Sequence, residues 1–159
     1  MRLWRLSRRV FAKEPLSGKG GLYASGRWHS APRLVVYTSQ SLALASLEVL
    51  VHVDFDLAPR GLVAMEIDVP DDVIVAGLTP ADLPRAWRRY PAPRSLQEFG
   101  NAWLGGLETA VLRVPSAVVP SEHNYLINPQ HPDVQRIRVV AKIPFTFDPR
   151  LIHRSGGTP

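Results

Sequence analysis

The sequence contains no cysteine, which excludes disulfide bonds, thiolate zinc sites and a cysteine nucleophile. It also lacks any run of about 18 consecutive apolar residues, the length that a transmembrane helix needs. The basic segment MRLWRLSRRV at the N-terminus is not followed by the apolar stretch of a signal peptide. We therefore expect a cytoplasmic protein that does not enter membranes.

Three common catalytic motifs are missing as well. The sequence has no P-loop, no GxGxxG motif after a strand and no GxSxG elbow. Their absence removes the main sequence support for a kinase, a Rossmann dehydrogenase or an α/β-hydrolase. His123 and His131 do not have the spacing of metal ligands on a helix. We expect no metal cofactor.

Lysine is scarce, with Lys13, Lys19 and Lys142 among 19 basic residues, so arginine supplies nearly all of the net charge of +5. An arginine-rich chain favours anionic partners, because the guanidinium binds phosphate and carboxylate groups through two parallel hydrogen bonds. The phosphates of a dinucleotide, an acidic protein and DNA all fit this charge. Solvated surface arginines that maintain solubility are the alternative.

The length and composition are those of one globular domain, since 45% of the 159 residues are hydrophobic and 21% are charged. We assign residues 1–159 to this domain and expect residues 151–159 to form a flexible C-terminal tail. Fifteen prolines divide the chain into short elements. Apolar and β-branched patterns predict strands at 2–6, 34–37, 61–69, 73–76, 110–114 and 137–143.

Two helices are predicted between these strands. The first covers residues 39–53, with the Ser39 hydroxyl as its N-terminal cap. The second begins with a capping box formed by Ser95 and Glu98 and ends at the glycine pair 105–106. About six strands and two helices without regular β–α–β alternation indicate an α+β fold.

Glu48 is the most informative residue, because it is a carboxylate in an otherwise apolar helix. Burying an ionised carboxylate costs several kcal/mol unless another group binds it. The sequence therefore predicts a partner for Glu48. A catalytic site, a structural ion pair with Arg27 and a solvent-facing helix position are all consistent with this pattern.

Arg27 and Tyr37 are further candidates for a binding site. Arg27 follows a glycine in the segment SGRWH, where it can bind a phosphate or stack on the neighbouring Trp28. Tyr37 lies in a predicted strand, where it can line a site or simply pack in the core.

The segment 113–132 is rich in hydrogen-bonding side chains and in prolines, and it is predicted to form a stiff loop. A stiff loop can present polar groups in fixed directions, which makes four residues candidates for a site: Ser116, Glu122, Asn124 and Asn128. Turn formation through bonds to the nearby backbone is the alternative role for each of them.

Taken in order, several segments resemble the RES family, named for shared arginine, glutamate and serine positions. The resemblance spans nearly the whole chain. It is carried by WRL at 4–6, GRW at 26–28, VYTS at 36–39, LALASLEVLVH at 42–52, GNAWL at 100–104 and VPSAVVPSEHNYLINPQHP at 114–132. The last segment is the most specific. His29 departs from the pattern, because many members have asparagine there.

The resemblance implies a fold like that of ADP-ribosyltransferases, an α+β fold with short strands in a split, partly orthogonal β core and flanking helices. It implies Arg27, Glu48 and Ser116 as catalytic residues, and Tyr37, Asn124 and Arg27 as ligands of the substrate NAD⁺. The implied reaction cleaves the nicotinamide–ribose bond by hydrolysis, or by phosphorolysis with inorganic phosphate as co-substrate. Transfer of ADP-ribose to a host protein, catalysed by a mono-ADP-ribosyltransferase, is the alternative.

The resemblance also implies the toxin component of a type II toxin–antitoxin system. Its expected partner is a cognate antitoxin with an Xre-like helix-turn-helix domain. Operator DNA is expected to bind only through the antitoxin, and a homo-oligomer can form within the complex. A different alternative is a basic module without catalysis that binds nucleic acid through Arg85, Arg88, Arg89 and Arg94. Such a module usually contains aromatic residues between its basic ones or a helix-turn-helix, and neither is evident in the sequence.

Overall fold

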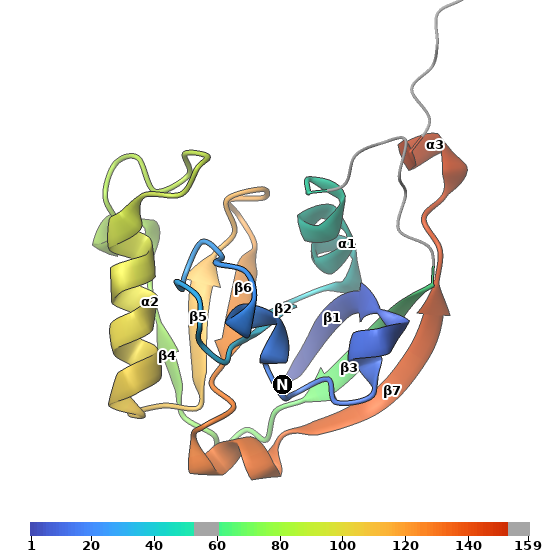
Figure 1. Ribbon diagram of the computed structural model, residues 1–159, viewed down its shortest axis with the longest axis horizontal. Coiled ribbons are helices and arrows are strands. Elements are labelled where there is room, and N and C mark those ends of the chain that lie inside the picture. Colours follow the sequence, from blue (N-terminus) through green and yellow to red (C-terminus); the bar gives the residue numbers. More distant parts are fainter. Residues whose placement is uncertain (53–60, 153–159) are drawn as a thin grey trace, which may run out of the picture.

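A seven-stranded sheet carries the fold in the computed structural model, which describes residues 1–52 and 61–152. The strand order is β4–β5–β6–β2–β1–β3–β7, and all neighbours are antiparallel except β4 and β5 (Figure 1). The strands are β1 (Arg2–Arg8), β2 (Val36–Ser39), β3 (Leu62–Asp68), β4 (Val75–Gly77), β5 (Val111–Pro115), β6 (His123–Ile127) and β7 (Arg138–Phe145).

The sheet is split between β1 and β2. These two strands pair at a single position, Trp4 with Ser39, whereas β1 pairs with β3 at seven positions. In Figure 1 the strands β1, β3 and β7 run at a steep angle to β4, β5 and β6. The predicted α+β fold with a split β core is therefore confirmed.

Three α-helices are described, α1 (Leu42–Leu50), α2 (Arg94–Gly106) and the short α3 (Pro149–Ile152). Helix α1 packs beside β1 and β2, at the split. Helix α2 covers the other half of the sheet, where its Leu96 and Leu104 pack against apolar residues of β5 and β6 (Figure 1). Short 3₁₀-helices occupy Arg9–Ala12, Lys19–Leu22, Pro80–Asp82 and Pro132–Arg136. None of the helices in the described part of the chain is long and apolar enough to cross a membrane.

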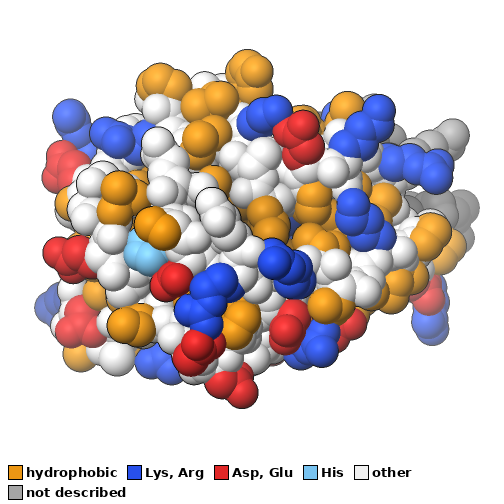
Figure 2. All heavy atoms as spheres, turned by 90° about the horizontal axis from the view of Figure 1, so that it is seen from below, with side chains coloured by type: hydrophobic (Ala, Val, Ile, Leu, Met, Phe, Trp, Pro, Cys, Tyr) orange, Lys and Arg blue, Asp and Glu red, His pale blue; other side chains and the backbone are white. Residues whose placement is uncertain are grey.

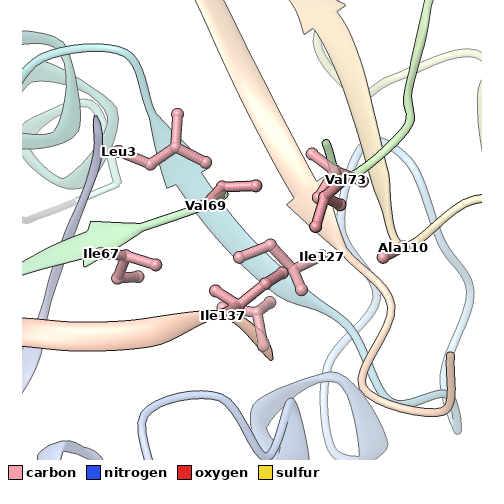
Figure 3. Packing of buried hydrophobic residues seen from close by; sticks show 9 residues of the cluster. Leu3, Ile67, Val69, Val73, Ala110, Ile127 and Ile137 are labelled. Atoms are coloured by element: carbon pink, nitrogen blue, oxygen red, sulfur yellow. The ribbon is translucent and has the colours of Figure 1, made fainter. Parts of the chain in front are cut away.

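The central hydrophobic cluster joins the two halves of the split sheet. Leu3 and Ile67 come from β1 and β3, while Val36 and Ile127 come from β2 and β6. Figure 3 shows Leu3, Ile67 and Ile127 gathered with Ile137 between these strands. Full burial of each such side chain contributes about 1.5–3 kcal/mol. This cluster keeps the two halves together although their backbones hardly pair.

The predicted N-cap of each helix is wrong by two residues. Ser41, not Ser39, caps α1, because its backbone is extended and its hydroxyl accepts a hydrogen bond from the Leu44 N–H at 3.1 Å. Ser39 still belongs to β2. Helix α2 begins at Arg94 after Pro93, without a side-chain cap, and Glu98 forms an exposed ion pair with Arg94 instead of a capping box.

Strand β6 was not predicted, because its residues lie in the segment expected to be a loop. His123–Ile127 pairs with β2 on one side and β5 on the other, so it lies inside the sheet. The prolines at 120 and 129 flank this strand without interrupting it, and Tyr125, Leu126 and Ile127 are good strand formers.

Two expectations fall partly outside the described residues. The first helix was predicted to end at Val53, which lies outside the described residues; α1 ends at Leu50. In the predicted tail, residues 151–152 belong to α3, and residues 153–159 lie outside the described part. A flexible tail stays a prediction.

Gly100 in α2 lies directly against the backbone of Trp28, next to Arg27. A Cβ atom at position 100 would lie 1.8 Å from the Trp28 carbonyl oxygen. The substitution Gly100→Ala must therefore push α2 away from this loop. We expect the free energy of unfolding to fall by about 2–3 kcal/mol, as measured by urea denaturation.

Gly105 in the same helix provides the matched control, because no heavy atom lies within 4 Å of the corresponding Cβ position. There the higher helix propensity of alanine should raise the stability by up to about 1 kcal/mol. A Gly100→Ala protein as stable as the wild type would contradict this close packing.

Candidate active site

A cleft of about 1260 Å³ opens where β1 and β2 separate. Its walls come from β1, β2, α1 and the loops around residues 27, 90 and 117. Helix α1 and the loop that precedes α2 both contribute residues to the cleft wall, and Figure 1 shows these two segments apart from each other. Pockets for small ligands usually measure about 300–1,000 Å³, so this cleft has room for a ligand the size of a dinucleotide.

Glu48 lies half-buried on α1 and is the only carboxylate that residues 1–52 and 61–152 contribute to the wall of this cleft. Its Oε1 accepts hydrogen bonds from the Ser116 hydroxyl at 2.7 Å and from the Asn124 amide at 2.5 Å. The Asn124 carbonyl in turn accepts a hydrogen bond from the Ser39 hydroxyl at 2.7 Å. This bond orients the amide so that its NH₂ group faces Glu48.

Ser116 is fully buried, at 0% exposure, and its hydroxyl has a fixed direction. The oxygen accepts hydrogen bonds from the backbone N–H groups of Val118 at 3.1 Å and Val119 at 3.0 Å. Both bonds use acceptor positions, so the hydroxyl proton points to Glu48. The carboxylate is thereby held through one oxygen, while Oε2 has no hydrogen-bond partner among the described residues.

Arg27 reaches the same cleft from the loop before β2. Its Nη1 donates hydrogen bonds to the carbonyl oxygens of Trp87 at 2.5 Å and Arg89 at 3.2 Å. Burial lowers the pKa of Arg27, and the negative charge of Glu48 acts in the opposite direction. No ion pair in the described part of the chain joins Arg27 to Glu48, so the two charges face the cleft separately.

Tyr37 lines the cleft with its ring, while its hydroxyl is used within the protein. The hydroxyl oxygen accepts a hydrogen bond from the Trp28 N–H at 3.2 Å, and His29 Nδ1 lies 2.9 Å away. His29 Nε2 lies 3.0 Å from the Ala24 carbonyl oxygen, which can only accept. Nε2 therefore carries the proton, and Nδ1 accepts from Tyr37. Burial raises the pKa of Tyr37 and lowers the pKa of His29.

Arg5 on β1 also lines the cleft, although it is absent from the residues that the sequence predicts for the site. Its Nη1 donates to the Tyr37 carbonyl oxygen at 3.1 Å, across the split between β1 and β2. Its Nε is buried and has no hydrogen-bond partner in the described structure. Burial lowers the pKa of Arg5 to about 10, so the group stays charged at neutral pH. The available signal was the arginine inside the motif WRL at 4–6.

The cleft thus brings together all five residues predicted for the site. Arg27, Tyr37, Glu48 and Asn124 line it, and Ser116 bonds to Glu48 from behind. The other two polar candidates lie elsewhere. Glu122 bonds to Ser41 at the start of α1, and Asn128 is buried against the Leu104 carbonyl oxygen. No group of three metal-ligating side chains occurs in the described segments.

Of the four arginines considered for nucleic-acid binding, Arg88 lines this cleft. Arg85, Arg88 and Arg89 are exposed on the loop before α2, while Arg94 is paired with Glu98. Basic and acidic side chains are interspersed on the face seen from below in Figure 2. Among the described residues, Glu48 is the sole acidic group of the cleft wall, so a bound anion would meet a predominantly positive surface there.

The sequence model of the RES domain matches residues 2–148. The chain belongs to the RES family. A relative named Toxin Res, from Pseudomonas putida, is 43% identical over 153 residues, which are 95% of this chain and 99% of that protein. The Prs ADP-ribosylating toxin of Sphingobium sp. is 38% identical over 156 residues, 96% of this chain and 97% of its own length. The predicted membership is confirmed.

A solved structure agrees with the fold. A chain in the crystal structure of the M. tuberculosis MbcT–MbcA toxin–antitoxin complex superposes with a TM-score of 0.74 at 20% identity. The match covers 95% of this RES protein and 86% of that chain. At this level of identity the likeness concerns the fold.

The buried His29 makes the stability of this RES protein depend on pH. Burial holds its pKa below the ordinary value of 6.5 in the folded state, so the unfolded chain takes up the proton first as the pH falls. The contribution of His29 to the free energy of unfolding is fully present above pH 6.5. It is lost as the pH falls from there to the folded-state pKa. We expect the free energy of unfolding to fall as the pH is lowered from about 7 to 5.5.

The variant His29→Asn isolates this contribution, because asparagine does not titrate while other groups keep their own pH dependence. Urea denaturation of both proteins at the two pH values measures the difference. The same loss of stability in the variant would show that His29 is not responsible.

Proposed function

We propose that this RES protein is a toxin that depletes NAD⁺ by breaking the bond between nicotinamide and ribose. The observation that carries the proposal is Glu48, a cleft carboxylate fixed by Ser116 and Asn124 with one oxygen left for a ligand. The names of the relatives support it, since one is an ADP-ribosylating toxin and others are named Toxin Res.

The reaction suits a single carboxylate. Nicotinamide is cationic in NAD⁺ and leaves as a neutral molecule with the electron pair of the broken C–N bond. No acid has to protonate it, unlike the leaving oxygen of an ordinary glycoside. The ribose becomes positively charged as the bond breaks. A preorganised negative charge at Glu48 stabilises this transition state, an effect typically worth several kcal/mol.

Glu48 Oε2 is the atom that we assign to the ribose hydroxyls. Ser116 and Asn124 hold the other oxygen, so they act through Glu48 as positioning residues. The Tyr37 hydroxyl is occupied by Trp28 and His29, which leaves only its ring face to pack on the nicotinamide.

Arg5 and Arg27 are suited to the pyrophosphate, because they bring two positive charges to the cleft wall. Arg5 uses Nη1 for the Tyr37 carbonyl oxygen, so its Nη2 group can donate to a phosphate oxygen. Arg27 is half-exposed and bonded to backbone oxygens through Nη1. Its other guanidinium N–H groups can bind an anion.

The group that accepts the ribose carbon determines which reaction takes place. Water gives hydrolysis and inorganic phosphate gives phosphorolysis; in both, an acceptor oxygen bonds to the ribose carbon and releases its proton to solvent. Mono-ADP-ribosylation of a protein is the alternative function, and the name of the Sphingobium relative favours it.

We also propose a cognate antitoxin with an Xre-like helix-turn-helix domain as the partner, in the cytoplasm. The structural likeness to a chain from a toxin–antitoxin complex supports this assembly. Operator DNA would then bind through the antitoxin, and copies of the RES chain could associate within the complex.

Product identification tests the proposed function. We expect purified protein, mixed with adenine-labelled NAD⁺, to release nicotinamide and to leave the label in a free ADP-ribose product. If phosphate is the acceptor, adding it changes the labelled product and accelerates the reaction. Glu48→Gln should lose at least about 100-fold in rate, because it keeps the acceptor oxygen for Ser116 and removes the charge.

If the label ends on protein, the reaction is ADP-ribosyl transfer and not NAD⁺ degradation. Full activity of Glu48→Gln, with its fold checked by circular dichroism, would remove Glu48 from the mechanism. Absence of nicotinamide release by the wild type would contradict the proposal altogether.

Arg5 is expected to strengthen NAD⁺ binding without stabilising the fold. Its replacement by methionine, Arg5→Met, removes a buried charge with an unbonded donor, a change that is often neutral or stabilising. We therefore expect unchanged or higher stability together with at least about tenfold weaker NAD⁺ binding, a loss of about 1.4 kcal/mol. Calorimetry in the Glu48→Gln background measures the affinity without turnover. Lower stability with unchanged affinity would assign Arg5 a purely structural role.

A further inference from the structure

Two aromatic rings face each other at the mouth of the cleft. Tyr90, on the loop before α2, is 81% exposed, and His52 follows α1 on the opposite wall. Their ring centroids are 6.3 Å apart and the ring planes are tilted by 49°. Neither ring bonds to Glu48 or to the groups that hold it, so the site described above leaves this pair without a role.

The backbone on both sides of this pair is fixed by other contacts. Arg27 donates hydrogen bonds to the carbonyl oxygens of Trp87 and Arg89, and Arg89 immediately precedes Tyr90. On the other wall, the His52 N–H donates to the Val49 carbonyl oxygen at 3.1 Å. The two rings are therefore presented at the cleft before any ligand enters.

A small movement of the rings would admit a third, planar ring between them. Stacked ring atoms lie about 3.5 Å apart, so a ring held between two others needs about 7 Å between the outer planes. Rotation of the exposed Tyr90 side chain can make the rings parallel and widen the present 6.3 Å by this small amount. Stacking of a base on an aromatic side chain contributes about 1–3 kcal/mol.

We propose that His52 and Tyr90 form the subsite for the adenine ring of the dinucleotide, an inference that rests on the proposed function. The nicotinamide ring is bonded directly to the ribose that Glu48 would hold, next to the fully buried Ser116. Adenine lies beyond the pyrophosphate. Arg27 lines the same cleft and donates a hydrogen bond to the carbonyl oxygen of Arg89, the residue before Tyr90.

The test compares two substrates that differ in the adenosine half. Nicotinamide mononucleotide has the scissile bond and lacks adenine, so only NAD⁺ should depend on the ring pair. We expect Tyr90→Ala to raise KM for NAD⁺ by about 5- to 100-fold and to leave kcat nearly unchanged. KM for nicotinamide mononucleotide should stay within about twofold. Tyr90→Phe should recover most of the NAD⁺ affinity, because stacking uses the ring.

Tyr23→Ala is the matched control, since Tyr23 is 84% exposed and does not line the cleft. It should leave KM for both substrates unchanged. An equal increase of KM for both substrates in Tyr90→Ala would place the rings on the nicotinamide half and overturn the inference. Unchanged KM for NAD⁺ would overturn it as well.

Calorimetry with ADP-ribose separates this inference from the proposed reaction, because it needs no turnover. ADP-ribose should bind about 5- to 100-fold more weakly to Tyr90→Ala than to the wild type, and equally to Tyr23→Ala and the wild type. Equal affinity of Tyr90→Ala and wild type for ADP-ribose would reject the adenine subsite even if NAD⁺ is cleaved. If the wild type does not cleave NAD⁺ but Tyr90→Ala still binds ADP-ribose more weakly than the wild type, only the proposed reaction would be rejected.

Discussion

The hydrogen bonds to Glu48 are the interaction on which this site depends. A carboxylate in an apolar helix is costly to bury unless it is bonded, and here Ser116 and Asn124 bond to the same oxygen at 2.7 and 2.5 Å. These bonds link α1 to Ser116, which directly follows β5, and to Asn124 in β6. The two hydrogen bonds thus fix the position of the carboxylate in the cleft.

The split sheet explains why the site lies where it does. Because β1 and β2 pair only at Trp4 and Ser39, the backbone leaves an opening that a continuous sheet would have closed. Arg5 crosses this opening to the Tyr37 carbonyl oxygen, and its Nε has no hydrogen-bond partner in the part of the chain that the structure describes. The hydrophobic cluster joins the two halves of the sheet although their backbones pair at a single position.

Much of the fold could be predicted from local patterns, and the rest depends on contacts between distant segments. Glu48 stands out in the sequence because its neighbours in the helix are apolar, a local signal. Strand β6 was missed because prolines around it resemble a loop, whereas its pairing with β2 and β5 comes from elsewhere in the chain. The burial of Arg5, and the approach of Tyr90 to His52 from 38 positions away, likewise arise only when the chain folds.

The most direct measurement is a crystal structure of the Glu48→Gln protein with NAD⁺. The expected complex has the hydroxyl groups of the nicotinamide ribose within hydrogen-bond distance of the residue 48 side chain, which Ser116 and Asn124 still hold. A dinucleotide bound with both of its riboses remote from residue 48 would contradict the role of this carboxylate.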